Sequence, residues 1–521
     1  MHGIPYMTEQ SMLTLINTNR MVPPIAPIGL DYVAASVRKA GIDVDVLDLC
    51  LCDDPDAALR NYFAAHSPEL VGISFRNADD SFWPSAEWFV PALAETIRNI
   101  RTLTDAAIVL GGVGFSIFAE RIVEHTGADF GIRGDGEKAV ISLLKELRRG
   151  RGFERIDGLI WRQACPERSR GNGPIRSNKP AWPSPLSLAT NRDAINNFAY
   201  FQRGGQCGVE TKRGCNRCCL YCADHLAKGV TLRLRDPAEV ADEVESLIGQ
   251  GVEVLHLCDS EFNIPREHAY AVCEEFVRRS LAERVRWYAY MAVVPFDAEL
   301  ALIMSRAGCV GVDFTGDSAC PSMLKAYRQS HLKEDLASAV RLCREHGIKV
   351  MIDLLLGGPG ETSETVAETI DFIKRVEPDC AGAALGVRIY PGTGMADVVA
   401  GEIPLAGDIS PRLPAGVPRP VAGAKAETNP NIHRRYDGPV DFFRPTFYIS
   451  QALGPRPAKL VRDLIAGDKR FFEPMEEILP ETATTGQSTD HNYNDNTELV
   501  EAIKKGARGA YWDILHELRS S

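Results

Sequence analysis

Three cysteines within eight residues form the chemical pattern that says most about this sequence. Cys215, Cys219 and Cys222 are spaced C-x3-C-x2-C, so their thiolates can converge on one inorganic centre. A [4Fe-4S] cluster usually takes four cysteines, and three would leave one iron open to another ligand. The alternatives are unpaired core thiols or a structural zinc site with Cys218 or Cys207 as its fourth ligand. The spacing favours the iron–sulfur cluster.

The residues around these cysteines resemble the cluster motif of the radical S-adenosylmethionine (SAM) enzymes. Tyr221 stands immediately before the last cysteine, and Lys212-Arg213-Gly214 precedes the first. In that family the three cysteines hold a [4Fe-4S] cluster, and SAM chelates the open iron through its amino and carboxylate groups. The resemblance implies the same two cofactors here, with Cys218 as an additional thiol outside the ligand set.

Four loops downstream of the cysteines, at 258–262, 315–319, 356–361 and 389–394, resemble the SAM-binding loops of the same family. A carboxylate in the first loop would bind the SAM ammonium group, and one in the second would accept from both ribose hydroxyls. Each loop alone would be an ordinary turn or helix cap, but four in order after a cysteine motif favour a SAM site. The SAM contacts that the resemblance implies are Asp259, Glu261, Asp317, Gly357 and Gly358.

Residues 207–400 must position these loops, and they alternate between apolar strands and amphipathic helices. In a parallel barrel the chemistry lies on the loops that follow the strands. The family's core is a partial (β/α)6 barrel, open on one side, and the predicted elements fit it. The expected strands are 254–257, 285–289, 310–314, 349–355 and 382–388, and the expected helices are 237–250, 267–279, 332–346 and 363–376.

Residues 1–150 alternate in the same way and predict a second α/β domain, a doubly wound, Rossmann-like parallel sheet. Ligands of such sheets bind beyond the carboxyl ends of the strands, where this chain carries Arg76 and glycine-rich turns. No G-x-G-x-x-G motif follows the first strand, which argues against a dinucleotide. The expected strands are 12–17, 44–49, 70–75, 107–110 and 130–133, with a helix at 27–41 that ends at Gly41.

The order of three segments, 23–30, 110–114 and 133–137, resembles the cobalamin-binding domain that precedes many radical SAM cores. The Asp-x-His-x-x-Gly motif that supplies a histidine to cobalt in other cobalamin domains is absent, so the lower cobalt ligand is left open. Arg76 is expected to face the corrin, with a solvated loop arginine as the alternative. For each glycine the alternative is a turn-shaping role. The implied cobalamin contacts are Arg76, Gly111, Gly112, Ser116, Gly134 and Glu137.

The other segments carry fewer signals. Residues 151–206 are predicted to be a connector. Residues 401–521 are predicted to form a Pro-rich linker and a small, mostly helical domain, with helices at 457–466 and 497–517. Aromatic and amide groups gather at 441–448 and 490–496. Such groups suit either a cap over a substrate pocket or packing within the C-terminal domain.

The composition sets outer limits on function. The 521 residues are too many for one core, and the net charge of −12 disfavours nucleic acid as the main partner. The sequence has no apolar run long enough to span a membrane and no signal-peptide pattern at its start. Its 14 cysteines are therefore expected to be reduced, in a cytoplasmic protein.

Together, the two resemblances predict an enzyme that uses a [4Fe-4S] cluster, SAM and cobalamin. Its expected reaction is methylation of an unactivated carbon of a small metabolite or peptide-derived substrate, with an electron donor such as flavodoxin or ferredoxin. A cobalamin-dependent radical SAM cyclase or another non-methylating radical enzyme is the first alternative, and polar methylation of a nucleophilic aromatic carbon is another. Outside enzymes, the alternative is a non-catalytic cobalamin- or metal-binding protein, which the SAM-type loops disfavour. No catalytic side chain is assigned.

Overall fold

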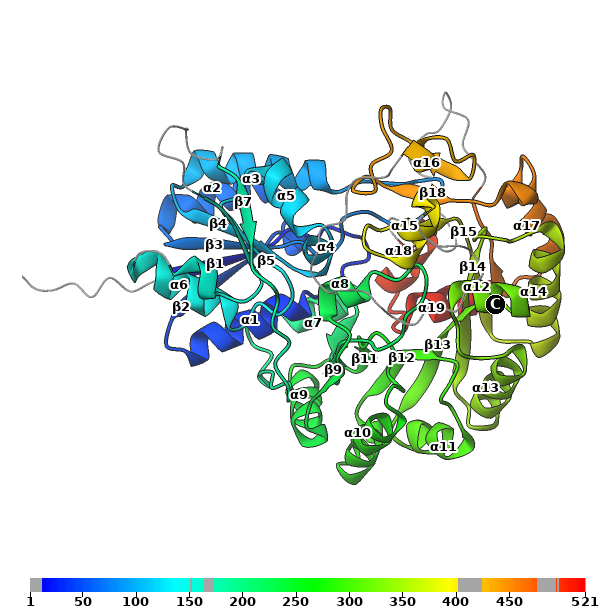
Figure 1. The fold of residues 1–521 in the computed structure, drawn as a ribbon. Coiled ribbons are helices and arrows are strands. Elements are labelled where there is room, and N and C mark those ends of the chain that lie inside the picture. The colour runs from blue at the N-terminus through cyan, green and yellow to red at the C-terminus, as the bar shows by residue number, and fades with distance from the viewer. Residues whose placement is uncertain are drawn as a thin grey trace, which may run out of the picture.

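The computed structural model describes residues 12–149, 152–163, 173–401, 424–475, 493 and 496–520. They form two α/β halves that lie side by side, each built on a seven-stranded sheet (Figure 1). Most of the predicted linker at 403–430, part of the 151–206 connector and most of the 490–496 cluster lie outside the described residues. None of the helices that the structure describes has the length and apolar character needed to cross a membrane.

The N-terminal sheet has the strand order β2-β1-β3-β4-β5-β6-β7. Its first five strands are parallel, which confirms the predicted doubly wound sheet, and the connector adds the last two in antiparallel orientation. The strand order reverses between β1 and β3, where ligands of such sheets bind. The strands are β1 (Met12–Asn17), β2 (Asp43–Asp48), β3 (Leu70–Ser74), β4 (Ala107–Gly111), β5 (Phe130–Ile132), β6 (Leu159–Arg162) and β7 (Ile175–Ser177).

Helices cover both faces of this sheet because its strands are apolar on both sides. Leu13 and Leu15 of β1 pack in a core with α1 (Ile28–Lys39) and α6 (Ala139–Arg149). Ile16 packs on the opposite face with α2 (Pro55–Ala65), α3 (Val90–Leu103) and α5 (Ala119–Thr126). The core on the α1 side continues into the barrel helices, so the two halves share apolar packing.

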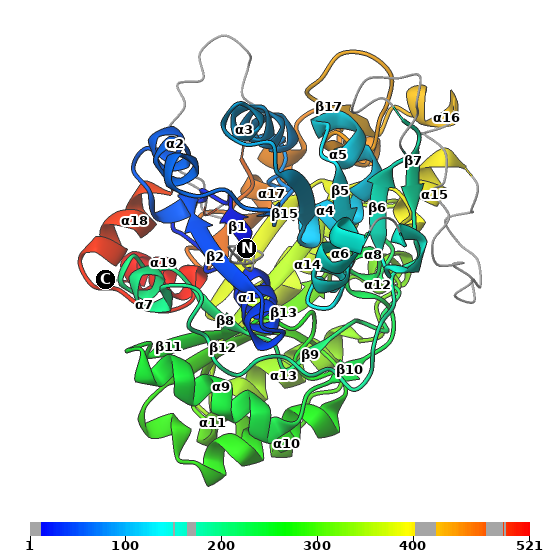
Figure 2. The same cartoon turned by 90° about the vertical axis from the view of Figure 1, so that its left-hand side faces the viewer.

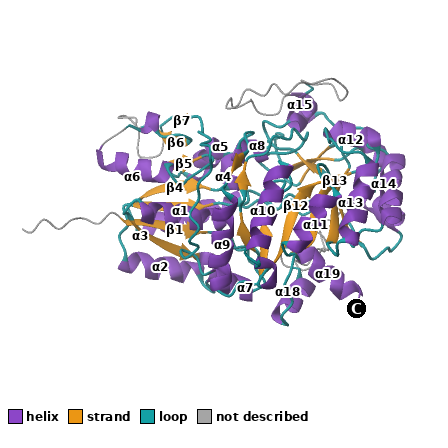
Figure 3. Cartoon of the chain, turned by 90° about the horizontal axis from the view of Figure 1, so that it is seen from below, coloured by secondary structure: helices purple, strands orange, loops and turns teal. Residues whose placement is uncertain are grey.

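The second sheet has the order β19-β15-β14-β13-β12-β11-β8, and all its strands are parallel. Six strands follow one another in chain order, as the predicted partial barrel requires, and helices lie along the outside (Figure 3). The strands are β8 (Cys207–Val209), β11 (Val254–Leu257), β12 (Arg286–Ala292), β13 (Cys309–Asp317), β14 (Lys349–Leu356) and β15 (Cys380–Leu385). The predicted helices appear as α9 (Pro237–Gly249), α10 (Arg266–Arg278), α13 (Lys333–Glu345) and α14 (Ser363–Val376).

Two barrel predictions were incomplete. The first strand, β8, is only three residues long, too short to give a periodic pattern, and it was not predicted. The strand expected at 382–388 is broken at Gly386, whose φ is +94°, so β16 (Val387–Arg388) leaves the barrel sheet. It pairs instead with β18 (Thr446–Tyr448) in a three-stranded sheet with β17 (Ile432–Arg434).

The C-terminal residues are spread over the barrel. Strand β19 (Phe471–Phe472) extends the barrel sheet beside β15, next to α17 (Pro457–Ile465). The helix predicted at 497–517 is two helices, α18 (Thr497–Lys504) and α19 (Tyr511–Ser520), because Gly506 interrupts it with φ of +105°. These two helices pack on the first residues of the barrel strands and close that end of the barrel (Figure 2).

Candidate functional site

The cysteine motif lies on the loop between β9 (Lys212–Arg213) and α8 (Asp224–Lys228). Helix α8 lies between the two halves of the molecule in Figure 1. Gly214, before the first cysteine, has φ of +88°, and a Cβ there would lie 2.1 Å from the carbonyl oxygen of Thr231. Only glycine allows this close approach. The N–H of Cys215 also donates to the carbonyl of Gly229 at 3.1 Å, so the loop is held closed at its start.

The three cysteine thiols lie close enough together to influence one another's protonation. Burial raises the pKa of Cys219 to about 12, and nearby Asp317, Glu261 and Cys215 add to the rise. Burial likewise raises the pKa of Cys215 and of Cys222. Binding an iron–sulfur cluster therefore requires these thiols to lose their protons to the metal.

The donor set fits a cluster better than the zinc site. Among the residues that the structure describes, no three His, Cys, Asp or Glu side chains meet closely enough to hold a single metal ion. Cys207, one candidate fourth ligand, is buried on β8 and donates to the carbonyl of Asn197 at 3.4 Å. Cys218, the other, is exposed. One buried and two half-buried thiols on one loop suit a multi-iron group that spreads its ligands apart.

Glu261 and Asp317 lie next to the cysteine loop. The hydroxyl of Tyr221 donates to both oxygens of Asp317 at 2.8 Å, and the amide of Gln329 donates to the same carboxylate. Thr315 donates to Glu261 Oε1 at 3.2 Å, while the buried Oε2 has no hydrogen-bond partner among the described residues. Burial raises the pKa of Glu261 to about 7 and that of Asp317 to about 6. The unpartnered oxygen of Glu261 is available to an ammonium group or to iron.

Asp259 differs from its expected SAM-binding role. Its side chain is fully buried, and its Oδ1 accepts from the N–H groups of Thr211 and Lys212 at 2.8 and 3.2 Å. Thr211 also donates its hydroxyl to Oδ2, and the Lys212 ammonium lies 3.6 Å away. The carboxylate is thus occupied by the protein, and it anchors the residues that lead into the cysteine loop.

Gly357 and Gly358 follow β14 at the same end of the barrel. Gly357 has φ of +94°, and a Cβ on Gly358 would lie 2.1 Å from the hydroxyl oxygen of Tyr327. The N–H groups of both glycines donate to one oxygen of Glu361, at 2.5 and 3.1 Å. Packing and turn formation account for both glycines, and their contact with SAM stays a prediction.

A cleft separates the N-terminal sheet from the cysteine loop, with an empty volume of about 1250 Å³ that includes open solvent at its mouth. The barrel side contributes Glu210, Arg213, Ala227 and Lys228, which flank the cysteines in sequence. The cleft is mostly apolar elsewhere, as expected for the site of a large ring. All six residues predicted to contact cobalamin line it: Arg76, Gly111, Gly112, Ser116, Gly134 and Glu137.

Gly112, Ser116 and Arg76, which all line the cleft, make different contacts with the protein. Gly112 has φ of +107°, and a Cβ there would lie 2.6 Å from the carbonyl oxygen of Phe75, so it shapes the turn after β4. Ser116 donates to Gly112 O at 2.8 Å and accepts from Gly134 N at 3.1 Å, so its hydroxyl joins two turns. Arg76 is exposed and donates to the side chain of Asn77 at 2.8 Å. Burial lowers the pKa of His256 on β11 to about 4, and the charge of Arg76 adds to this lowering.

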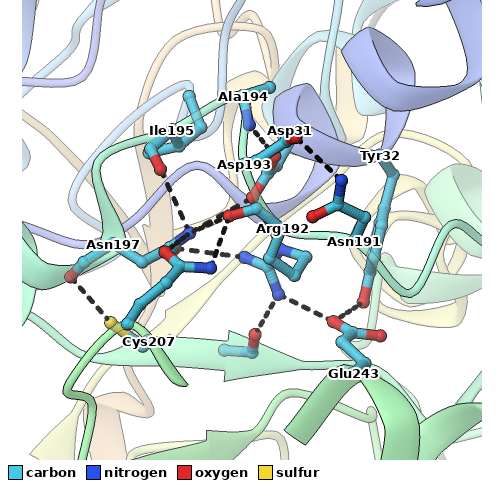
Figure 4. Close-up of polar contacts among 12 residues, drawn as sticks. Asp31, Tyr32, Asn191, Arg192, Asp193, Ala194, Ile195, Asn197, Cys207 and Glu243 are labelled. Atoms are coloured by element: carbon cyan, nitrogen blue, oxygen red, sulfur yellow. Dashed lines mark hydrogen bonds and ion pairs between the residues drawn. The ribbon is translucent and has the colours of Figure 1, made fainter. Parts of the chain in front are cut away.

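A buried polar network that sequence reasoning missed joins the two halves (Figure 4). Arg192, from the connector, donates to Asp31 of α1 at 2.6 Å and to Glu243 of α9 at 2.7 Å. The Tyr32 hydroxyl donates to the same Glu243 oxygen at 2.7 Å, and Arg235 pairs with the other oxygen at 2.6 Å. Asp31, the one charged residue on the buried face of α1, was the signal in the sequence.

The chain matches two family models, one for the radical SAM superfamily over residues 209–373 and one for the B12-binding domain over residues 16–144. It is 30% identical to the tryptophan 2-C-methyltransferase of Streptomyces laurentii, over 97% of this chain and 96% of the relative. It is 26% identical to an anaerobic magnesium-protoporphyrin IX monomethyl ester cyclase of Cereibacter sphaeroides, over 68% of this chain and 57% of that protein.

Solved structures extend the match to the whole fold. The methyltransferase TsrM of Kitasatospora setae, with tryptophan and a SAM analogue bound, superposes with a TM-score of 0.84 at 31% identity over 98% of both chains. A second TsrM structure, with cobalamin and a [4Fe-4S] cluster, gives 0.82 at 30% identity over 98% of both chains. OxsB, at 18% identity and a TM-score of 0.59, shares the fold over 73% of this chain and 53% of its own.

Proposed function

This chain belongs to the cobalamin-binding radical SAM methyltransferases, and from that premise we propose that its substrate is tryptophan or a closely related aromatic amino acid. The support is a tryptophan methyltransferase that matches nearly the full length of the chain. Bound cobalamin supplies methyl transfer, with SAM as the methyl source, and the cluster supplies electron chemistry. The protein itself binds, orients and shields these groups.

The observation that carries the proposal is the wall shared by the cleft and the cysteine loop. Arg213 stands two residues before Cys215 and also lines the cleft. A ring bound in the cleft would therefore have the cluster loop along one edge and Arg76 at the end of β3. This arrangement suits a methyl carrier that must reach both SAM and a substrate inside the barrel.

The residue roles follow from these positions. Cys215, Cys219 and Cys222 would hold the cluster, and Glu261 would bind a cationic partner at the barrel mouth. Asp317, fixed by Tyr221, would accept from the ribose. Arg76, Gly111, Gly112, Ser116, Gly134 and Glu137 would form the cobalamin cleft. Their division into domains at 1–150, 207–400 and 401–521, with a connector at 151–206, is part of the same proposal.

The position of methylation decides between radical and polar chemistry. Carbon 2 of an indole ring is a nucleophilic aromatic carbon, whereas the sequence led us to expect an unactivated carbon. We propose polar transfer to such a ring carbon, so turnover should yield S-adenosylhomocysteine without a matching amount of 5′-deoxyadenosine. Equal amounts of the two products would favour the radical route.

Two further expectations belong to this proposal. An electron donor such as flavodoxin or ferredoxin would restore reduced cobalamin or cluster after accidental oxidation. The enzyme would act in the cytoplasm, since the described cysteines are free thiols, as a reducing compartment keeps them.

An anaerobic assay with methyl-labelled SAM tests the proposal. Protein reconstituted with iron, sulfide and cobalamin is incubated with tryptophan, and label should enter a methylated product. The matched control is Cys219→Ala, which should give no labelled product. If no aromatic amino acid becomes labelled, the proposed substrate is wrong. A demethylated or cyclised product that carries no label would favour the cyclase-type alternative.

A further inference from the structure

The inner face of the barrel carries a polar layer below the cysteine loop. Strand residues alternate, so Trp287, Ala289 and Met291 pack outward against the helices while their neighbours point inward. In register, Tyr290 of β12 pairs with Asp313 of β13, and Thr315 of β13 pairs with Asp353 of β14. The inward residues that concern us are His256, Tyr290, Asp313, Thr315 and Asp353.

Tyr290 faces an open space inside the barrel. Its strand has a neighbour on each side, and the adjacent Ala289 and Met291 are fully buried, yet Tyr290 is 43% exposed. Its ring lies 4.6 Å from the ring of His256, measured between centroids, at an interplanar angle of 51°. The two rings form one wall of this space.

Asp313 and Asp353 lie against each other on the same inner face. Asp313 is 6% exposed and hydrogen-bonds to the carboxyl of Asp353, while its buried Oδ1 has no hydrogen-bond partner among the described residues. Burial raises the pKa of both acids, that of Asp353 to about 7. Two adjacent carboxyls that share a proton carry one negative charge and attract one cation.

We propose that Asp313 and Asp353 bind the ammonium group of the substrate, while Tyr290 and His256 contact its aromatic ring. This inference rests on the proposed function and names the group by which the substrate is recognised. An ammonium group would balance the charge of the pair and use the free Oδ1 of Asp313. The tyrosine ring adds a surface that favours cations and flat rings.

The surroundings of the pair set the direction in which the substrate would lie. Thr315 connects the layer to Glu261 by a hydrogen bond of 3.2 Å, toward the cysteine loop. On the other side, Tyr288 and Asp513 close the barrel floor with a hydrogen bond of 2.6 Å. A substrate bound at the pair would therefore lie between the barrel floor and the barrel mouth, with its ring beside Tyr290 and His256.

Tyr493 comes from the C-terminal cluster that the sequence singled out. Burial raises the pKa of Tyr493, and the charges of Asp353 and Asp313 add to the rise. Its ring also makes an edge contact with Tyr511 at 5.7 Å between centroids. Tyr493 therefore packs in the cluster that α18 and α19 form at the barrel floor.

Equilibrium dialysis of the anaerobically reconstituted protein tests the inference. Tryptophan and its deaminated analogue indole-3-propionate are compared. The native protein should bind tryptophan at least about tenfold more tightly, which corresponds to about 1.4 kcal/mol. The isosteric double variant Asp313→Asn with Asp353→Asn should lose this preference, mostly through weaker binding of tryptophan. If the two aspartates served only in packing, the double variant would bind both compounds more weakly, by the same factor.

Asp513→Asn is the matched control, because Asp513 is a buried carboxylate of the barrel floor outside the proposed site. It should keep the preference for tryptophan. The inference is overturned if the native protein binds both compounds equally or neither, or if the double variant keeps the preference. Tight, amine-dependent binding of tryptophan without methylation would support the inference while contradicting the proposed function. Methylation of both compounds with equal efficiency would support the proposed function while contradicting the inference.

Discussion

Arg213, at the end of β9 just before the cysteine loop, forms an ion pair with Glu137 of the N-terminal half, with 2.8 Å between Nη2 and Oε1. Both side chains are nearly buried, at 9% and 12% exposure. The same guanidinium reaches Asp135 at 3.1 Å and Glu210 at 2.7 Å. The Lys-Arg-Gly that precedes the cysteines and the Arg-Gly-Asp-Gly-Glu turn after β5, which are far apart in sequence, therefore meet at the wall of the cleft.

Glu137→Gln should weaken cobalamin binding. The change removes one of the three carboxylates that hold the Arg213 guanidinium, and with it the ion pair that joins this arginine to the Glu137 side of the cleft wall. The dissociation constant for cobalamin should rise about tenfold, equivalent to about 1.4 kcal/mol, as measured by absorbance titration. Glu124→Gln, at an exposed carboxylate, should bind like the native protein. Unchanged binding in both variants would show that the ion pair does not shape the cleft.

Cys218→Ala and Cys219→Ala should have opposite effects on the cluster. Cys218 is exposed and outside the proposed ligand set, so its loss should leave the iron and sulfide content at the native level. Cys219 is a proposed ligand, and its loss should remove most of the iron. Iron analysis and the absorbance of the reconstituted proteins measure both outcomes. Loss of iron from both variants would mean that the ligand set is wrong.

Gly112→Ala should disrupt the cleft, whereas Gly29→Ala should not disturb the fold. A Cβ at position 112 would lie 2.6 Å from a carbonyl oxygen at a φ of +107°, so the variant should lose about 2 kcal/mol or more of stability. Gly29, on α1 and also lining the cleft, has open space around its Cβ position. Chemical denaturation compares the two. Equal stability would contradict the strain assigned to Gly112.

Arg192→Met should destabilise the protein by about 3 to 5 kcal/mol, because it leaves the buried Asp31 without its cation and Glu243 with Arg235 alone. Asp31 and Glu243 are fully buried, and Arg192 is 1% exposed. Arg38→Ala breaks the neighbouring surface pair with Asp193, where both side chains are about half exposed, and should cost less than about 1 kcal/mol. Urea denaturation checks the difference. Similar losses would mean that the network adds little to the joint between the halves.

Glu361→Gln should change the pH dependence of stability. Burial raises the pKa of Glu361 to about 7 from an ordinary 4.5, so between these values the folded state binds more protons than the unfolded state. The free energy of unfolding therefore falls as pH rises through this window. Glutamine keeps an acceptor for the two glycine N–H groups and removes the ionisation.

Above pH 7 the Glu361→Gln variant should consequently be more stable than the native protein, by up to about 3 kcal/mol. Near pH 4 the difference between the two should be small, since Glu361 is then mostly protonated in both states. Denaturation of the metal-free proteins across this range measures the difference. A constant difference at every pH would show that Glu361 does not titrate in this window.

The sequence by itself determined both α/β halves and the cysteine motif. Alternating apolar strands and helices of ordinary length are local patterns, so their bounds agree with the structure to within a few residues, as for α14. Ligand spacing is equally local, and the comparisons confirmed the family that it indicated. Motif order likewise predicted that Arg76 and Glu137 contact the same ligand, and both residues line the cleft.

Only the tertiary structure decided which carboxylates are occupied by the protein and which face open space. Asp259 and Glu261 stand two residues apart, yet the first is occupied by backbone N–H groups and the second keeps a free oxygen. The partners of Arg192 and the meeting of Asp313 with Asp353 depend on packing between segments remote in sequence. Hydrogen bonds and burial of this kind are long-range properties, which a local pattern of residue types does not contain.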